Sequence, residues 1–367
     1  GTVDTAQNPI EVINEKPEVE KEVKNAAGNW GNASDYSVGD TVPYRVMVDV
    51  PKNINKLVNF TLTDTMVNQT YKQDTLKIYS DASFTSEIPS SSYNVDVSSD
   101  KKTWSISFNS KDEQGKISSV LEAYGGQKIC VSFDTILEEG AVSESTGNPN
   151  TVKLEYSNKI LPSSNEDGNP NPTGTPSKDE ISDQATVYTF KIAVEKVDAS
   201  DNSKKLEGVK FDLYRKLANT ADGEGVLTNP VSGLTGKYER VKHDLTTGEQ
   251  GVIEVNGLKN GEYYLVETKT IGDYNLLKKP VKVNISAAYT TTTKTTTTTE
   301  GEKTTITKEV TSESYSGNEI KTVVKNSKGF TLPTTGGMGT VIFSVLGIAL
   351  VLAGLLVITA SRKKAAK

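Results

Sequence analysis

Cysteine and histidine are almost absent from this chain of 367 residues, which has one of each, Cys130 and His243. A lone cysteine excludes an intramolecular disulfide, and without a Cys/His cluster we expect neither a zinc site nor a histidine-based catalytic triad. We interpret Cys130 as a buried strand residue and His243 as a surface residue, and we expect no metal and no cofactor. The net charge of −6 is spread without a basic patch, which argues against nucleic acid as a partner.

Charge is also absent from one long stretch near the C-terminus, residues 341–360, which is rich in Leu, Val, Ile and Ala. Twenty apolar residues in a helix are long enough to cross a hydrocarbon core of about 30 Å. The basic residues of the tail that follows, 361–367, mark the cytoplasmic side of a membrane. The sequence therefore predicts a transmembrane helix over 341–360, with most of the chain outside the cell.

A short motif precedes this apolar segment within residues 329–340. Its residues are Leu332, Pro333, Thr334, Thr335 and Gly336. Proline favours extended backbone both at its own position and at the residue before it, so the motif should be accessible to an enzyme groove. Motif, apolar segment and basic tail together resemble the C-terminal sorting signal of Gram-positive cell-wall proteins. A chance match in front of an ordinary membrane anchor is the alternative.

That resemblance implies processing by a sortase, either a class C pilus sortase or the housekeeping enzyme. The bond between Thr335 and Gly336 would be cut, and Thr335 would pass to an amine on another pilin subunit or on a peptidoglycan cross-bridge. The membrane would then hold only the precursor, and the mature protein would lie on the cell wall surface.

The rest of the chain consists of short alternating apolar and polar runs separated by turn residues, which is typical of strands. The predicted strands are Val42–Val50, Lys56–Leu62, Trp104–Phe108, Ile129–Leu137, Thr186–Val197, Lys210–Leu213, Tyr263–Glu267 and Val281–Ile285. A segment rich in Pro, Ser and Asn, residues 161–186, is typical of a linker. We expect an all-β chain of two tandem Ig-like or Cna-type β-sandwich domains, followed by the single membrane helix.

The predicted boundaries are an N-terminal segment 1–16, a first domain 17–160, the linker 161–186 and a second domain 187–328. We expect that a signal peptide was removed ahead of Gly1. Within the second domain, residues 290–299 hold nine threonines and Lys294. Because threonine favours extended backbone, this insert is expected to form a long exposed hairpin or loop, with glycosylation or ligand contact ranked below that structural role.

Each half carries a lysine on the inward face of its first strand. Lys21 has the same strand parity as Val19 and Val23, and Lys196 continues an apolar row that includes Val194. An unpaired ammonium in a core is costly, so such a lysine should be neutralised, paired with a carboxylate or consumed chemically. Burial also favours the free amine, which is a nucleophile.

The first half resembles the fimbrial isopeptide-forming D2 domain through the runs SDYSVGDTVPYRVMVDVP (34–51), FTLTDTM (60–66) and LEYSN (154–158). The second half resembles a CnaB-type pilin domain through VEKVD (194–198), GVKFDLYRK (208–216), YYLVET (263–268) and the run VVKNSKGFTLPTTGG (323–337). In such domains a buried lysine condenses with an asparagine amide beside an acidic residue and releases ammonia.

By position, the resemblance implies one bond between Lys21 and Asn158 assisted by Asp64. It implies a second bond between Lys196 and Asn326 assisted by Glu267. A salt bridge to the same carboxylate, with no covalent bond, is the alternative at each site. At the first site Lys16 and Lys24 compete with Lys21 for the role.

Backbone pilins also carry a linking lysine in a WxxxVxVYPK motif, which we do not find in this sequence. Lys16 lies in roughly that region but in a different context, so either the motif lies upstream of Gly1 or the subunit is terminal in a pilus. We expect a sortase-processed pilus subunit whose chemistry is limited to its own intramolecular bonds. The alternative is a monomeric wall-anchored adhesin that binds a host or matrix ligand. No site for an enzyme acting on an external substrate is recognisable.

Overall fold

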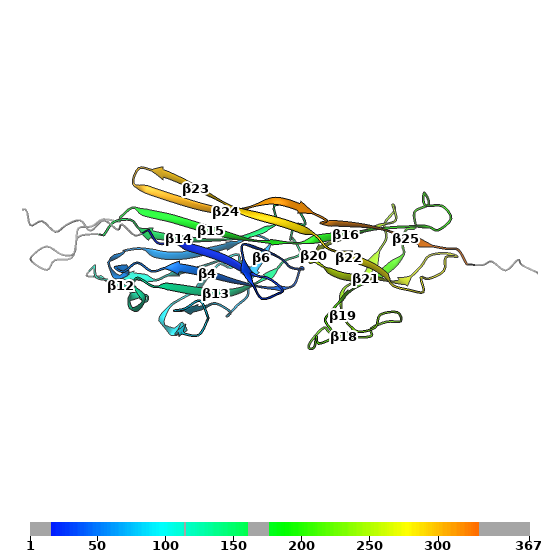
Figure 1. Cartoon of the computed structure of the whole chain (residues 1–367), viewed down its shortest axis with the longest axis horizontal. Coiled ribbons are helices and arrows are strands. Elements are labelled where there is room, and N and C mark those ends of the chain that lie inside the picture. The colour runs from blue at the N-terminus through cyan, green and yellow to red at the C-terminus, as the bar shows by residue number, and fades with distance from the viewer. Residues whose placement is uncertain (1–15, 114, 161–175, 330–367) are drawn as a thin grey trace, which may run out of the picture.

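The computed structural model describes residues 16–113, 115–160 and 176–329 of the chain. Its regular structure is almost entirely β, as the sequence predicts, and the strands form two units that follow one another along an elongated molecule (Figure 1). Three short 3-10 turns are the only helical elements in this part of the chain: η1 (Ile54–Lys56), η2 (Ser90–Ser92) and η3 (Glu122–Tyr124).

The first unit packs two large sheets face to face. One has the order β2-β1-β4-β13-β7-β8, with β6 paired to β13. Its strands are β1 (Val19–Lys24), β2 (Trp30–Gly31), β4 (Thr41–Asp49), β6 (Gln69–Tyr71), β7 (Lys77–Tyr79), β8 (Glu87–Ile88) and β13 (Lys128–Leu137). A small hairpin of β11 (Asn109–Lys111) and β12 (Ile117–Ser119) lies beside them.

The second large sheet has the order β23-β24-β15-β14-β5-β10-β9, with β3 paired to β15. Its strands are β3 (Ala33–Asp35), β5 (Phe60–Met66), β9 (Asp96–Val97), β10 (Thr103–Ser107), β14 (Asn148–Ser157), β15 (Lys178–Tyr188), β23 (Ala288–Glu300) and β24 (Lys303–Ser316). Two of these, β23 and β24, come from the far end of the sequence.

The second unit also has two sheets. The smaller has the order β20-β16-β25 and the larger the order β18-β19-β17-β21-β22. The strands are β16 (Phe190–Asp198), β17 (Lys210–Lys216), β18 (Leu227–Thr228), β19 (Lys237–Thr246), β20 (Val252–Leu258), β21 (Gly261–Lys269), β22 (Val281–Ile285) and β25 (Glu319–Asn326). The first strand, β16, and the last, β25, are parallel neighbours.

Alternation of apolar and polar residues places one face of the central strands in a core. In β5, for example, Phe60, Leu62 and Met66 are buried, whereas Thr61 and Thr63 are half-buried on the other face. Each unit has its own large cluster of buried apolar side chains. Cys130 is buried in β13 and His243 is exposed, as expected.

The predicted linker 161–186 is wrong in its C-terminal part. Residues 178–188 form β15, which pairs with β14 from Asn148↔Val187 to Ser157↔Lys178. Its inward residues include Asp179 and Asp183, both about 7% exposed. Because these charged residues occupy core-facing positions, the sequence of this segment does not show the apolar alternation of a strand.

The threonine-rich insert forms a long hairpin, as expected. Its strands, β23 and β24, pair from Ala288↔Ser316 to Glu300↔Lys303. The hairpin reaches back over the first unit, where β24 runs parallel to β15 at Ile181↔Ile306 (Figure 1). The insert is therefore an element that joins the two units.

The sorting motif (332–336), the apolar segment 341–360 and the basic tail 361–367 lie outside the described residues. Within the described ranges no helix is long and apolar enough to cross a membrane.

Candidate functional site

The second unit brings its predicted lysine, asparagine and acid together. Lys196 lies on β16 and Asn326 ends the parallel neighbour β25, while Glu267 projects from β21 in the opposing sheet. The Lys196 Nζ donates a hydrogen bond to Asn326 Oδ1 at 2.6 Å, and Asn326 Nδ2 donates to Glu267 Oε1 at 2.7 Å. The Lys196 Nζ also lies 3.5 Å from Glu267 Oε2. All three predicted residues therefore meet in one buried cluster.

The environment of this cluster favours a neutral amine. The side chains of Lys196 and Glu267 are 0% exposed, and Asn326 is 0% exposed as well. Burial lowers the pKa of Lys196, and the nearby Glu267 carboxylate opposes that shift. Thr270 was not predicted from the sequence, and its Oγ1 accepts a second hydrogen bond from Asn326 Nδ2 at 2.9 Å. The amide nitrogen is thus held from two sides while its oxygen faces the lysine.

The first unit holds Lys21 in a closely similar environment. The Lys21 Nζ, on β1, lies 2.5 Å from Asp64 Oδ2 on β5, and both side chains are 0% exposed. Lys21 and Asp64 therefore form a buried pair in the first unit. The rings of Tyr44 and Phe133 stack on each other and each lies 4.7 Å from the Lys21 Nζ. The backbone N–H of Lys21 donates to Asp183 Oδ2 at 2.7 Å.

Burial moves the pKa values of this pair in opposite directions. It lowers the pKa of Lys21 and raises that of Asp64, and the attraction between the two groups opposes both shifts. Amide formation needs a neutral lysine amine as the nucleophile and a protonated carboxyl as the acid, and these shifts favour both forms.

The structure does not bring Asn158 to Lys21, so this part of the prediction is wrong. Asn158 lies just beyond the end of β14, where its Nδ2 donates to Asp179 Oδ1 at 2.9 Å and to the Glu302 carbonyl at 2.7 Å. Its Oδ1 accepts a hydrogen bond from Ser177 at 2.8 Å. The amide of Asn158 is thus hydrogen-bonded elsewhere, beside the turn that joins β23 to β24.

A different asparagine of the same strand occupies the cluster. Asn150 is 0% exposed, and its side chain lies beside the Asp64 carboxyl and the Tyr44 hydroxyl. Neither Nδ2 nor Oδ1 of Asn150 has a well-formed hydrogen bond, and Oδ1 of Asp64 also lacks one. A buried amide left without partners costs roughly 2–7 kcal/mol. Sequence reasoning missed Asn150, although its separation from Lys21 (150 − 21 = 129) nearly equals that between Lys196 and Asn326 (326 − 196 = 130).

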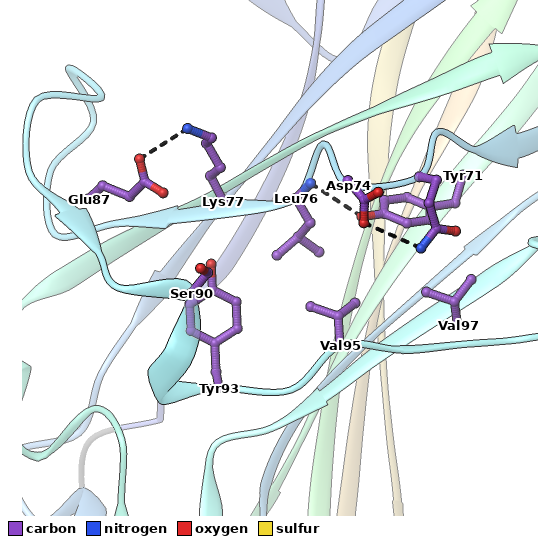
Figure 2. A pocket seen from close by; sticks show the side chains of 10 residues that line it. Tyr71, Asp74, Leu76, Lys77, Glu87, Ser90, Tyr93, Val95 and Val97 are labelled. Atoms are coloured by element: carbon purple, nitrogen blue, oxygen red, sulfur yellow. Dashed lines mark hydrogen bonds and ion pairs between the residues drawn. The ribbon is translucent and has the colours of Figure 1, made fainter.

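A shallow pocket of about 450 Å³ lies on the first unit, away from both clusters. Figure 2 shows Leu76, Val95 and Val97 in its wall, with an ion pair of 3.1 Å between Lys77 Nζ and Glu87 Oε2 at one side. The ion-pair side chains are 50% and 41% exposed. The pocket therefore has the solvated character of a surface, in contrast to the dry lysine clusters. Within the described residues no group of His, Cys, Asp and Glu could hold a metal ion.

Comparison with known proteins identifies two segments. Residues 190–300 match the SpaA family, described as a prealbumin-like fold domain, and residues 324–367 match the LPXTG cell wall anchor motif. The chain is 24% identical over 280 residues to the trypsin-resistant surface T6 protein of Streptococcus pyogenes, covering 64% of this chain and 48% of that protein. It is 29% identical over 211 residues to the fimbrial subunit type 1 of Actinomyces viscosus, covering 52% and 34%. The chain spans half or less of these curated relatives.

Two solved structures share the fold. The T6 backbone pilin of serotype M6 Streptococcus pyogenes superposes with a TM-score of 0.54 at 17% identity, over 86% of this chain and 71% of that one. The 35 kDa C-terminal fragment of the major pilin GBS80 of Streptococcus agalactiae gives a TM-score of 0.50 at 16% identity, over 85% and 100%.

Proposed function

We propose that this Gram-positive cell-wall surface protein, a pilin by its prealbumin-like domain and its LPXTG anchor, serves as a structural subunit of a sortase-assembled pilus. In this role the sortase cuts between Thr335 and Gly336 and joins Thr335 to an amine of another subunit or of a peptidoglycan cross-bridge. The observation that carries the proposal is a cluster of buried lysine, asparagine and acid in each of two successive units ahead of the anchor. The two units would act as tandem Ig-like sandwich domains, with a membrane helix present only in the precursor.

In the second unit the proposed reaction joins Lys196 to Asn326. The neutral Nζ attacks Cγ of the asparagine, the new C–N bond forms, and the bond from Cγ to Nδ2 breaks with release of one ammonia. Glu267 is placed to carry the proton, because its carboxyl lies 3.5 Å from the attacking Nζ and 2.7 Å from the departing Nδ2. No oxidant, metal or external reactant is needed.

In the first unit the corresponding reaction joins Lys21 to Asn150, with Asp64 in the role of Glu267. The unpartnered amide of Asn150 and the unpartnered Oδ1 of Asp64 support this assignment over the expected Asn158. A protonated Asp64 would polarise the amide carbonyl, and a raised pKa favours that protonation state.

The proposed bonds would direct tension away from most of each unit. One bond would tie β1 to β14, and the other would tie β16 to the final strand, β25. A pull on the chain ends would then pass through an amide, and the strands enclosed by each crosslink would carry little load. This suits a fibre that has to resist shear without unfolding.

Electrophoresis of cell-wall extracts tests the proposed role in a pilus. A pilus subunit gives a ladder of high-mass species that survives boiling in detergent and disappears when the pilus sortase is deleted. A single wall-linked band that is unchanged by that deletion would instead indicate a monomeric adhesin.

The intramolecular bonds are tested separately by the intact mass of residues 1–331, expressed as a soluble protein without the sorting motif and anchor. The mass should fall short of the sequence mass by two ammonias, and peptide mapping should recover branched peptides that join Lys21 to Asn150 and Lys196 to Asn326. A full sequence mass would refute the crosslinks whatever the electrophoresis shows.

A further inference from the structure

The threonine-rich hairpin is held firmly against the first unit. Besides the pairing of β24 with β15, the Lys303 Nζ lies 2.9 Å from Glu180 Oε1, and the Lys308 Nζ lies 2.8 Å from Glu18 Oε2. At the other strand, Thr291 Oγ1 donates to Asn32 Oδ1 at 2.9 Å. These contacts fix the hairpin in position, so its outer strand is presented in a defined orientation.

That outer strand, β23, is the last strand of its sheet, and no strand pairs with its outer edge within the described part of the chain (Figure 1). Residues 292–300 are all exposed. A row of unpaired backbone N–H and C=O groups on a rigid edge is a template for another strand. Natural proteins usually protect such edges with charges, prolines or bulges, but the run from Thr295 to Thr299 has none of these.

The two charges that flank this run lie on one face of the strand. Lys294 and Glu300 are six residues apart and therefore have the same parity. This is the outer face, because residues of the other parity, Thr291 and Thr293, contact Asn32 of the first unit. Across their own hairpin Lys294 lies opposite Glu309 and Glu300 lies opposite Lys303, but within the described ranges neither pair is in salt-bridge contact.

We propose that β23 is a self-association surface that pairs antiparallel with β23 of a second copy of this chain. The register places Thr297 on the two-fold axis, so Thr295 faces Thr299 and Lys294 faces Glu300 of the partner copy. Each contact then has two cross-strand ion pairs that enclose a ladder of threonines. Opposite charges and Thr–Thr pairs directly across neighbouring strands are favourable.

The position of the charges selects this register. If the whole of β23 paired about its centre, Lys294 would face the same lysine of the partner copy, and like charges directly opposite are unfavourable. A strand made of nearly identical residues would otherwise slip freely, because each shift by two residues gives an equivalent face.

In the pilus, on which this part of the inference rests, the surface would align fibres side by side. A single pairing of seven residues is weak, but a fibre repeats it at every subunit, and linked copies bind far more strongly than single ones. The hairpin would thus bundle pili laterally, whereas the sortase-made bonds join subunits along each fibre.

A charge-swap series in the full-length protein tests the register. Lys294→Glu and Glu300→Lys should each reduce the fraction of bundled fibres severalfold in electron micrographs, and the double variant K294E/E300K should restore it. Detergent-resistant ladders should remain in all three strains. Bundling that persists in both single variants, or that is not restored in the double variant, would overturn the proposal.

An engineered cysteine tests the two-fold contact without needing a fibre. Cys130 is buried, so Thr297→Cys adds the single accessible thiol of the described residues. In a strain lacking the pilus sortase, mild oxidation should give a disulfide dimer of the wall-linked protein on a non-reducing gel. Thr292→Cys is the matched control, because its two copies would lie ten residues apart along the pairing, about 33 Å, and should stay monomeric. Equal dimer yields for both variants, or no dimer with Thr297→Cys, would refute the contact even if pilus ladders form.

Discussion

Replacing Asn150 with alanine should break the first crosslink and lower the stability of the first unit sharply. The proposed bond closes a loop of 129 residues between Lys21 and Asn150. In the loop-entropy picture, which was developed for disulfides, a loop of that length contributes about 5 kcal/mol. For a unit of this size, each kcal/mol corresponds to a Tm change of roughly 2–4 °C. We therefore expect the Tm to fall by about 10–20 °C.

Asn158→Ala is the matched control, since it removes the asparagine just beyond the end of the same strand. Asn158 is only half-buried and would lose its hydrogen bonds to Asp179 and to the Glu302 carbonyl, each worth about 1 kcal/mol. Differential scanning calorimetry at a fixed scan rate gives the Tm of both variants, and intact mass shows whether each bond has formed. Relative to its own sequence mass, Asn150→Ala should lack only one ammonia, whereas Asn158→Ala should lack two, as the parent does.

The opposite result would refute the assignment. If Asn158→Ala lost the ammonia deficit and Asn150→Ala kept it, Lys21 would react at the position suggested by family resemblance, and the geometry of this cluster would be wrong. If neither variant changed the deficit, Lys21 would form no amide with either residue.

Three further predictions concern other buried positions. Glu267→Gln should block the proton transfer at Asn326 while the first crosslink still forms. Its intact mass should then fall short of its sequence mass by one ammonia instead of two. A deficit of two ammonias would contradict the role given to Glu267. Burial raises the pKa of the Cys130 thiol to about 11, so the folded protein should resist alkylation at pH 9. The free energy of unfolding should fall by about 2–3 kcal/mol as the pH rises from 9 to 11, because only the unfolded thiol ionises in that range. Chemical denaturation of Cys130→Ala should lack this pH-dependent component, and an unchanged pH dependence would refute it. Gly147 has φ +60°, and a Cβ there would lie 2.3 Å from Thr186 Cγ2. Gly147→Ala should therefore lower the free energy of unfolding, measured in urea, by about 1–3 kcal/mol. An unchanged free energy of unfolding would contradict the close packing.

Strand parity predicted the inward positions of Lys21 and Lys196, because burial of a strand face follows directly from period-two alternation. The acids, Asp64 and Glu267, came from family resemblance, and the structure places each beside its lysine. What makes these positions recognisable is an ammonium in an apolar row, which is rare enough to stand out in a single sequence.

The choice between Asn150 and Asn158 could not be made from parity, since the two residues are eight apart and therefore have the same parity in the sequence. Which asparagine lies beside Lys21 is decided by the register of β14, and that register depends on pairing with β5 and β15 rather than on local sequence. The near-equal lysine–asparagine separations in the two units were the one sequence signal that favoured Asn150.

Strand β15 escaped prediction because its stability depends on distant partners. Asp183 accepts the backbone N–H of Lys21, and Asp179 accepts the backbone N–H of Thr304 at 2.8 Å. Two buried carboxylates in one segment indicate a loop when the segment is considered alone. In the strand their carboxylates are satisfied by contacts more than 100 positions away in the sequence.

The pairing of β24 with β15 also constrains the order in which the protein can mature during export. A chain that crosses the membrane with its N-terminus first presents β15 long before β24, and the pairing at Ile181↔Ile306 requires 125 further residues (306 − 181) to emerge. Until then the part of this edge of β15 that β3 does not cover is open to neighbouring unfinished chains, and unpaired strand edges are sites of misassembly. A secreting cell would benefit from shielding this edge during translocation, and faults in assembly are expected to concentrate in that interval.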